Sequence, residues 1–515
     1  MLALAILAGA AFLRLHNLNQ VGLNSDEAVY AGQAAGLAGF TQYQRLFGLF
    51  RAHPLMIQLI VAAVYRVTGV SGLTAREVMV GFGVALVLIV GLCALVLWGR
   101  IGALIAMLFV AVSQYPIAVS RQILLDGPEA VFVACCLLFF CLYVRRGRVE
   151  YLWAATFSAG LAFLSKETAI LLVPAVLAFF ILAPEVVPRR RPLAIAIAIY
   201  VVTILPYPLA ELGAGKAGTG GNYLAWQVLR PANHDLLFYL GVFGAIGWAI
   251  TGLAVLGIVL ALRRRSPTDL LLLSFTLVVF AFLELWPTKG YEYLVPLVAP
   301  VTLLAVSGVT WLASAVTRAV HTAQTSPRHT GRGLGLWIPG GLTALTVVSM
   351  FFWASPVLSA QDGTASLVGT DSGQQTPTKV TVLAGSGGLL AGRPTGLWVK
   401  THTLRGSSFL TIGPTFANVL QFYSLDRAVA LSVSPDPLHR NPSYAPVTNA
   451  DKLIRSGAVQ YLVYDAYSAA RSQHFANRLL ALAHKFEGQL VYQYDRGRSA
   501  SGERRALVLI YEVQP

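Results

Sequence analysis

Two adjacent carboxylates, Asp26 and Glu27, lie in the stretch LNSDEAVY, a few residues after the first apolar run of the sequence. A carboxylate at such a site can act as a general base and take a proton from an attacking hydroxyl. The same residues begin an expected helix, DEAVYAGQAAGLAG, with Ser25 as its N-cap and both acids in the first turn, where the helix dipole favours negative charge. A capped helix start without a chemical role is the alternative. We predict that Asp26 is the base and Glu27 a helper.

A second acidic stretch, SRQILLDGPEA, repeats this theme. Gly127 and Pro128 end the preceding segment and leave the carboxylate of Asp126 near the membrane surface. Two carboxylates opposite several cations suit a reaction in which a nucleophile loses a proton while an anionic group departs. Asp126 is therefore a third candidate catalytic residue.

The elements that must position these residues are membrane helices. Of the 515 residues, 56% are hydrophobic and only 12% are charged, and the apolar runs approach the ~20 residues that cross a bilayer. Basic residues come in short clusters between these runs, which is typical of cytoplasmic loops and accounts for the net charge of +15 without a nucleic-acid partner. The four cysteines all fall in apolar runs and indicate no disulfide framework.

The pattern predicts eleven crossings, with the N-terminus cytoplasmic and the C-terminal part extracytoplasmic, in the plasma (inner) membrane. Segment 54–70 is apolar but short and contains Arg66, and counting it as a crossing would place the later arginine clusters outside. We therefore expect it to lie in the outer interface. The first crossing is short and has no basic flank, so a cleaved signal peptide is an alternative there. The expected crossings are 1–14, 78–98, 102–119, 129–144, 151–164, 168–184, 193–210, 236–262, 269–286, 293–313 and 335–354.

With this orientation nearly every carboxylate of the membrane part falls on the outer side, next to several cations. Ionisable residues at span ends are costly unless solvated or paired, so such a set from separate loops indicates a water-filled outward cavity. The outer loop from Glu211 to Asp235 is glycine-rich at first and is expected to be either a mobile lid or a plain connection. Its candidate substrate contacts are Tyr223, Trp226, Arg230 and His234.

Six pieces of the chain, in order over residues 1–310, carry a resemblance to a known family. They are NSDEAVYA, RAHPLMIQLI with His53 and Pro54, GVSGLTAREVMVGFG with Arg76, SRQILLDGPEA, LSKETAILLVP with Lys166, and KGYEYLVPLVAP. This set resembles the GT-C fold glycosyltransferases of family 39, which include protein O-mannosyltransferases and the bacterial transferases that add aminoarabinose to lipid A. The chain departs from the family pattern at His53, which is followed by a single proline, and at Glu292, where the family often has arginine.

The resemblance implies a transferase that passes a sugar from a polyprenyl-phosphate carrier to an acceptor hydroxyl on the outer face. Asp26 would be the base of a single inverting displacement, and Asp126 would help to position acceptor or sugar. The departing phosphate needs cations and hydrogen-bond donors; the candidates are His53, Arg121, Lys166, Lys289 and Tyr293. No cofactor is required. A divalent metal is an open alternative, because Asp26, Glu27, His53 and His234 offer ligand atoms without the close spacing of a dedicated site.

The C-terminal third has a different composition. We expect a transmembrane catalytic domain at 1–355, with residues 15–76 as its first outer loop, a linker at 356–378 and a soluble α/β domain at 379–515. Strand-like runs lie near 380, 397, 428, 459, 490 and 506, and helical runs lie at PTFANVLQFYSL, NADKLIRSGA and FANRLLALAHKF. Asn449 is the expected N-cap of the second helical run and Gly457 its stop. This alternation predicts a partly parallel sheet.

Taken together, the sequence predicts a polytopic GT-C glycosyltransferase, with a polyprenyl-phosphate-linked sugar as donor and a glycan, lipid or protein as acceptor. A transporter is the first alternative, but it should show internal repeats and interrupted spans, whereas here no repeat is found and the polar residues sit at outer span ends. A non-catalytic membrane scaffold or receptor is the second, and in that case Asp26 and Asp126 would carry no chemistry.

Overall fold

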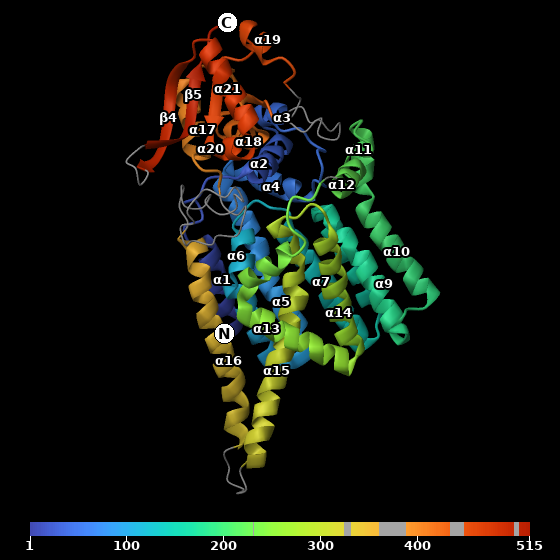
Figure 1. Ribbon diagram of the computed structural model, residues 1–515. Helices are drawn as coiled ribbons and strands as arrows, with labels where there is room; N and C mark the ends of the chain where they lie inside the picture. Colours follow the sequence, from blue (N-terminus) through green and yellow to red (C-terminus); the bar gives the residue numbers. More distant parts are fainter. Residues whose placement is uncertain (230, 324–330, 360–387, 433–446, 499–503) are drawn as a thin grey trace. The chain divides into compact units, whose positions relative to one another are not determined.

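A computed structural model describes residues 1–229, 231–323, 331–359, 388–432, 447–498 and 504–515 (Figure 1). The chain forms two compact units. The helical unit contains Met1–His16, Glu77–Arg121 and Leu125–Leu358. The sheet unit contains Asn17–Arg76, Gln122–Leu124 and Ser359–Pro515. The first predicted outer loop therefore belongs to the same unit as the C-terminal domain.

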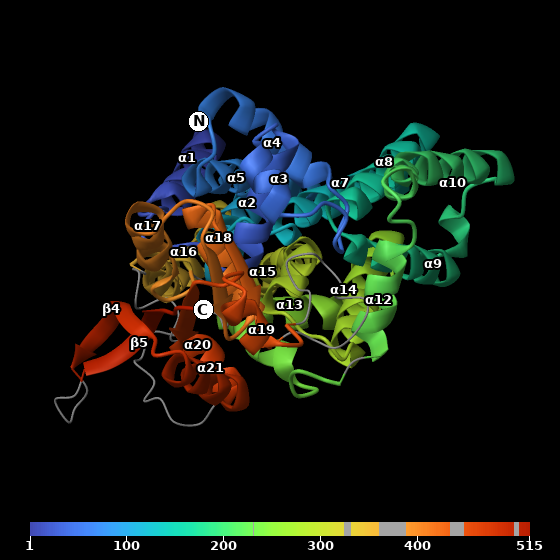
Figure 2. The ribbon, with the colours of Figure 1, turned by 90° about the horizontal axis from the view of Figure 1, so that it is seen from above.

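The helical unit consists of long apolar helices that end at polar or glycine residues. Two of the predicted crossings are joined in α5, which changes direction at Gly99, where φ is 74°. Helices α8 and α10 pack against each other, and Figure 2 shows them side by side. The elements are α1 (Leu2–Leu15), α5 (Gly72–Val112), α6 (Gln114–Ser120), α7 (Asp126–Arg146), α8 (Val149–Ser165), η1 (Glu167–Leu171), α9 (Leu172–Leu182), η2 (Pro184–Val186), α10 (Arg190–Ile204), α11 (Pro206–Gly213), α12 (Thr219–Leu229), α13 (Phe238–Arg264), α14 (Pro267–Leu285), η3 (Tyr291–Leu297), α15 (Val298–Ala323) and α16 (Gly331–Leu358).

Each predicted crossing coincides with helical structure, which confirms the polytopic fold. Among the described residues, six helical segments are long and apolar enough to cross a membrane by length and composition. They are Gly72–Val112, Asp126–Arg146, Arg190–Gly213, Phe238–Arg264, Pro267–Leu285 and Tyr291–Val316. Shorter apolar helices account for the other expected crossings that begin at 1 and 168, so the number of crossings stays a prediction.

Helices α13 and α15 approach each other closely at two glycines. A Cβ atom at Gly257 would lie 2.0 Å from the carbonyl oxygen of Leu304, and one at Gly308 would lie 2.4 Å from that of Leu253. Small residues at such positions let membrane helices pack backbone against backbone, where dispersion contacts stabilise the pair. The two glycines therefore fix the separation of these helices.

The sheet unit combines the first outer loop with an α/β domain. Its five strands have the order β2-β1-β3-β5-β4. Strand β1 is parallel to both β2 and β3, whereas β5 is antiparallel to β3 and β4. The elements are α2 (Ser25–Leu37), α3 (Thr41–Leu46), α4 (Met56–Thr68), α17 (Gly392–His402), β1 (Ser408–Thr411), α18 (Pro414–Ser424), β2 (Arg427–Ala430), α19 (Ala450–Arg455), β3 (Tyr461–Asp465), α20 (Ala466–Arg471), α21 (Gln473–Lys485), β4 (Gln489–Arg498) and β5 (Arg504–Glu512).

The alternation of strand residues gives the sheet a core on each face. Leu410 and Leu462 pack in one buried cluster with Ile454 of α19 and Leu479 of α21. The neighbouring pair in the register, Phe409 and Tyr461, points to the other face, where the two rings stack with centroids 5.0 Å apart. The period-two pattern of these short strands thus separates two packed layers.

Most of the expected elements of the C-terminal domain are confirmed. The partly parallel sheet is present, and Asn449 caps α19 by accepting a hydrogen bond from the amide of Lys452 at 2.9 Å. Gly457 follows the helix at φ 68°. Segment 54–70 forms α4, which packs on α2 in the sheet unit. The expected strand near 380 and most of the expected linker lie outside the described residues.

One expected strand is wrong and one strand was missed. The run LWVKT near 397 belongs to helix α17, whose buried residues Gly392, Thr395, Gly396 and Val399 follow the helical period. The run was expected to be a strand because it contains Leu and Val. Leu397 is exposed, however, so an apolar residue here does not indicate a side chain buried against a sheet. The four residues of β1 were too short to stand out, although they form the centre of the parallel part.

We predict that Gly257→Ala lowers the melting temperature of the purified protein in detergent. The added methyl group has to push α13 away from the backbone of α15, and such overpacking costs about 1–3 kcal/mol. Gly252→Ala is the matched control, because a Cβ at Gly252 of the same helix meets no atom within 4 Å. Equal melting temperatures for the two variants would contradict the close approach.

A second prediction concerns Asp465, at the end of β3. Its Oδ1 accepts a hydrogen bond from the amide of Ser468 at 2.7 Å, and its buried Oδ2 has no hydrogen-bond partner among the described residues. Burial raises the pKa of Asp465 from 3.8 to about 6, against the lowering effect of Ser468. Between these two values the folded state binds more protons than the unfolded state, so its stability falls as the pH rises through this window.

Asp465→Asn keeps an N-cap and removes the buried charge. We therefore expect slower hydrogen exchange of β3 and α20 in the variant than in the wild type at pH 7.5, and a difference that shrinks towards pH 4. Hydrogen exchange of the full-length protein, followed by mass spectrometry, measures both. A variant that exchanges faster than the wild type at both pH values would show that the charge stabilises the fold.

Candidate active site

The first acidic stretch is held by a capping box at the start of α2. Asn24 is the N-cap: its Oδ1 accepts a hydrogen bond from the amide of Glu27 at 2.9 Å, and Glu27 Oε2 accepts one from the amide of Asn24 at 2.9 Å. The expectation that Ser25 caps this helix is wrong, because Ser25 is already its first residue. The cap thus moves one residue back and places Glu27 at the third helical position, as the box requires.

Glu27 is completely buried and forms a bidentate ion pair with Arg76. Arg76 Nε lies 2.7 Å from Glu27 Oε1, and Arg76 Nη2 lies 2.7 Å from Oε2. The guanidinium also donates to the carbonyl oxygens of Leu18 at 3.1 Å and Gly22 at 2.8 Å, and the amide of Ile123 donates to Glu27 Oε1 at 3.0 Å. Every one of these bonds lies inside the sheet unit, so Glu27 fixes the loop, and a catalytic role for it stays a prediction.

Asp26, the residue next to Glu27, is exposed. The capping box and the ion pair together hold the first turn of α2 with Glu27 inward and Asp26 outward. His53, a candidate phosphate ligand, belongs to the same unit and contacts Tyr30 edge to face, with ring centroids 5.9 Å apart. Asp26 is therefore the carboxylate of the pair that a substrate can reach.

The second acidic stretch lies in the helical unit, where Asp126 begins α7. Its Oδ1 lies 2.6 Å from the ammonium nitrogen of Lys166, and both side chains are buried. The same nitrogen lies 4.2 Å from the ring centroid of Tyr293. Three of the predicted site residues, from three separate segments, are thus brought together.

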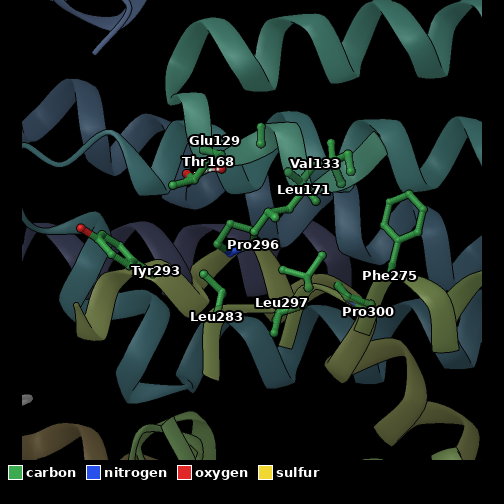
Figure 3. Close-up of a pocket in the computed structure, with 13 residues that line it drawn as sticks. Glu129, Val133, Thr168, Leu171, Phe275, Leu283, Tyr293, Pro296, Leu297 and Pro300 are labelled. Carbon is green, nitrogen blue, oxygen red and sulfur yellow. Dashed lines mark hydrogen bonds between the residues drawn. The ribbon is translucent and has the colours of Figure 1, made fainter. Parts of the chain in front are cut away.

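An apolar cleft lies beside this cluster (Figure 3). One end is polar: Glu129 accepts a hydrogen bond from the hydroxyl of Thr168 at 2.8 Å, and its second oxygen is buried without a hydrogen-bond partner in the described structure. Tyr293, whose ring lies against the ammonium group of Lys166, lines the cleft as well. The remaining lining is apolar: Val133, Ala169, Leu171, Leu172, Phe275, Val279, Leu283, Pro296, Leu297 and Pro300.

Two other predicted phosphate ligands make bonds to the backbone. Arg121 Nη1 donates to the carbonyl oxygens of Leu13 at 3.2 Å, Arg14 at 3.1 Å and His16 at 2.6 Å, and so caps the C-terminus of α1. The ammonium group of Lys289 donates to the carbonyl oxygens of Asp235 and Leu236 at 2.8 and 2.7 Å. These cations satisfy the ends of helices and loops, and a role for them at a phosphate stays a prediction.

The segment from Glu211 to Asp235 is more ordered than a simple loop. It contains the end of α11 and the whole of α12, separated by Gly215 and Gly218, which have positive φ values of 67° and 78°. Glu211 Oε1 accepts a hydrogen bond from the amide of Gly220 at 2.9 Å and ties the two helices together. The candidate contacts Tyr223 and Trp226 lie on α12, His234 stacks on Phe238, and Arg230 lies outside the described residues.

The sequence did not indicate the partners of several of these residues. Arg76 was known only as part of a motif, although a charged residue at the start of a long apolar helix signals a buried partner. Glu129 and Thr168 were missed because nothing in their spacing links α7 to η1. Within the described ranges, no three His, Cys, Asp or Glu side chains lie close enough together to hold a metal ion, and a metal at the site stays an alternative.

Comparison with known proteins supports the resemblance seen in the sequence. A family model described as dolichyl-phosphate-mannose-protein mannosyltransferase matches residues 52–209. No curated protein sequence matches the chain. The fold is similar to that of ArnT from Cupriavidus metallidurans, solved bound to undecaprenyl phosphate, with a TM-score of 0.68 and 15% sequence identity over 99% of this chain and 97% of ArnT.

A second solved structure with a similar fold is the archaeal oligosaccharyltransferase AglB from Archaeoglobus fulgidus, in complex with an inhibitory peptide and a dolichol-phosphate. The TM-score is 0.62 and the identity 15%, over 98% of this chain and 74% of AglB. At such identities the likeness shows the fold. The chain is therefore a multi-pass membrane protein with the fold of the GT-C glycosyltransferases, as the resemblance to that class predicted.

Proposed function

We propose that this chain is an integral-membrane glycosyltransferase that moves a sugar from a polyprenyl-phosphate carrier to an acceptor hydroxyl on the extracytoplasmic side. The observation that carries the proposal is the division of roles at the start of α2. Glu27 is buried and bound to Arg76, while its neighbour Asp26 is exposed on the same rigid turn. A preorganised, accessible carboxylate of this kind is what a general base requires.

The proposed step is a single displacement at the anomeric carbon. The acceptor oxygen forms a bond to this carbon on the face opposite the phosphate, and its proton passes to Asp26. The bond between the anomeric carbon and the phosphate oxygen breaks, and polyprenyl phosphate departs with the bonding electrons. The configuration of the sugar is therefore inverted.

The apolar cleft of the helical unit supports the donor side of the proposal. A polyprenyl phosphate has an anionic head and a branched apolar chain. The cleft has aliphatic and aromatic walls, and the ammonium group of Lys166 lies 4.2 Å from the ring centroid of Tyr293, one of the lining residues. Cations near a departing phosphate stabilise the charge that develops on it. Lys166 would have to share its bond to Asp126 with the phosphate. ArnT was solved with undecaprenyl phosphate and AglB with a dolichol-phosphate, so both relatives in fold bind such lipids.

The charge pattern supports the proposed orientation in the membrane, which we take to be the plasma (inner) membrane. Basic clusters such as 145–148, 189–191 and 263–265 follow the rule for cytoplasmic loops, which leaves the acidic stretches on the other side. The acceptor is a hydroxyl of a glycan, a lipid or a protein. No cofactor is needed for the step as written, and a bound divalent cation would act by stabilising the phosphate charge.

We predict that Asp26→Asn abolishes sugar transfer and leaves the fold unchanged. Purified protein in lipid is offered a panel of polyprenyl-phosphate sugars, and the release of polyprenyl phosphate is measured. A general base contributes about 10²–10⁴-fold to a rate. Glu150→Gln is the matched control, because Glu150 is also an exposed acid in the first turn of a helix. Turnover of no donor by the wild type would favour a scaffold or a transporter.

We predict a different outcome for Glu27→Gln. The change leaves the buried guanidinium of Arg76 without its carboxylate, and breaking a buried ion pair in this way costs about 3–5 kcal/mol. The melting temperature should therefore fall, whereas Asp26→Asn should not change it. The double variant Glu27→Gln, Arg76→Met removes the stranded charge and should recover part of the loss. A Glu27→Gln protein that melts like the wild type would contradict the structural role of Glu27.

A further inference from the structure

The parallel part of the sheet contains a point at which the strand order reverses. The chain leaves β1 through α18 to β2 on one side, and later returns as β3 on the other side of β1. The carboxyl ends of β1 and β3 therefore lie at the same edge of the sheet. In open α/β sheets, ligands bind outside the carboxyl ends of the strands at such a point.

Two connections meet at this edge. The first follows β1 and contains Gly413, and the second is α20, which begins directly after β3. A Cβ atom at Gly413 would lie 3.2 Å from the hydroxyl oxygen of Ser468, so the backbone of the first connection lies against the first turn of α20. The side chains of α20 next to this contact therefore lie at the same edge of the sheet.

The start of α2 is docked on α18 within the same unit, and Figures 1 and 2 show the two helices next to each other. Asn418 Nδ2 donates to the hydroxyl oxygen of Ser25 at 3.0 Å, and the amide of Leu23 donates to the hydroxyl oxygen of Tyr423 at 3.1 Å. The amide of Leu389 donates to the carbonyl oxygen of Leu23 at 3.0 Å. These bonds flank Asp26 on the N-terminal side and tie its turn to the α/β domain.

The start of α2 lies near α20, because Asn418 of α18 binds Ser25, the residue before Asp26, and Gly413, the residue before α18, lies against Ser468 of α20. Burial raises the pKa of the Tyr467 phenol, the charge of Asp26 adds to this effect, and the nearby guanidinium of Arg471 opposes it. The Arg471 Cζ atom lies 4.4 Å from the centroid of the Tyr467 ring, so the ring holds the exposed guanidinium in place. Tyr467 keeps its proton at neutral pH, and both side chains therefore offer hydrogen-bond donors.

The groups at this place are complementary to part of a sugar. Asp26 accepts the proton of one hydroxyl, and donors beside it can bind the oxygen of a neighbouring hydroxyl. Arginine has several N–H donors in a fixed geometry and no acceptor, so it binds oxygen atoms and not N–H groups. A vicinal diol presents the two oxygens at the required short separation.

We propose that Tyr467 and Arg471 bind the acceptor of the transfer reaction, and that this acceptor is a sugar whose reacting hydroxyl has a second hydroxyl beside it. The proposal rests on the proposed function, because it takes Asp26 as the base. It assigns acceptor recognition to the C-terminal α/β domain. The two residues touch the acceptor through the neighbouring oxygen and take no part in the proton transfer.

The test measures the dependence of transfer on acceptor and on donor separately. The acceptor probe is envelope membrane from cells that lack this protein, and the donor is the labelled polyprenyl-phosphate sugar that the wild type consumes. Arg471→Gln is expected to raise the half-saturating amount of acceptor membrane about tenfold or more, which corresponds to the loss of a charged hydrogen bond. The half-saturating donor concentration should stay within twofold of the wild type. Tyr467→Phe, which keeps the ring, should change the acceptor value in the same direction by a smaller factor.

The matched control is Arg455→Gln. Arg455 is also an exposed arginine of the sheet unit, and its guanidinium carbon lies 5.4 Å from the centroid of the Phe486 ring. This variant should behave as the wild type in both assays, and thermal unfolding verifies that all variants are folded. Unchanged acceptor values for Arg471→Gln and Tyr467→Phe would overturn the proposal, as would an equal rise in the donor value.

A second arm tests the class of acceptor. Periodate cleaves vicinal diols, so periodate-treated membranes should no longer accept sugar from the wild type, while protease-treated membranes should still do so. The reverse pattern would show a protein acceptor and overturn the assignment of a sugar. If the wild type consumes no donor at all, even by transfer to water, the proposed function itself fails and this inference falls with it.

Discussion

The ion pair between Glu27 and Arg76 is the interaction on which the arrangement of the first acidic stretch depends. Burial removes both charges from water, which is costly, and the structure offsets this cost with a bidentate contact and further bonds to backbone groups. These bonds connect residues 18–22, the start of α2, the start of α5 and the short segment at Ile123. A single buried pair thus joins residues 18–27 to two stretches that are distant in the sequence, at Arg76 and at Ile123. The exposed position of Asp26 follows from it.

The buried charges of the helical unit are also paired or hydrogen-bonded. Asp126 and Lys166 neutralise each other at 2.6 Å, and Arg14 and Arg121 donate to carbonyl oxygens and one hydroxyl near α1 and α6. In an apolar surrounding, polar groups persist only when they are paired or hydrogen-bonded. Glu129 departs from this rule, because one of its oxygens is buried at the cleft without a hydrogen-bond partner in the described part of the chain.

Hydropathy and charge predicted much of this architecture. Long apolar runs fix helix positions because the bilayer sets their length. The exclusion of 54–70 from the crossings stays a prediction, because α4 is a short apolar helix like those at Leu2–Leu15 and Glu167–Leu182. Contacts between distant segments were not predictable in this way. Tertiary packing determines the partner of Arg76, the cap at Asn24 and the contact of α2 with α18. A local sequence pattern does not contain this information. The helix at 392–402 was taken for a strand for the same reason, since Trp398 and Val399 fit either structure.

In the proposed mechanism Asp26 acts as a base and forms no bond to the sugar. The stereochemistry of the transferred sugar tests this most directly. NMR spectra of the donor and of the first product give the anomeric configuration before and after transfer. We expect inversion, because the acceptor attacks opposite the departing phosphate in one step. Retention would contradict it, since it requires two displacements and a covalent sugar–enzyme intermediate.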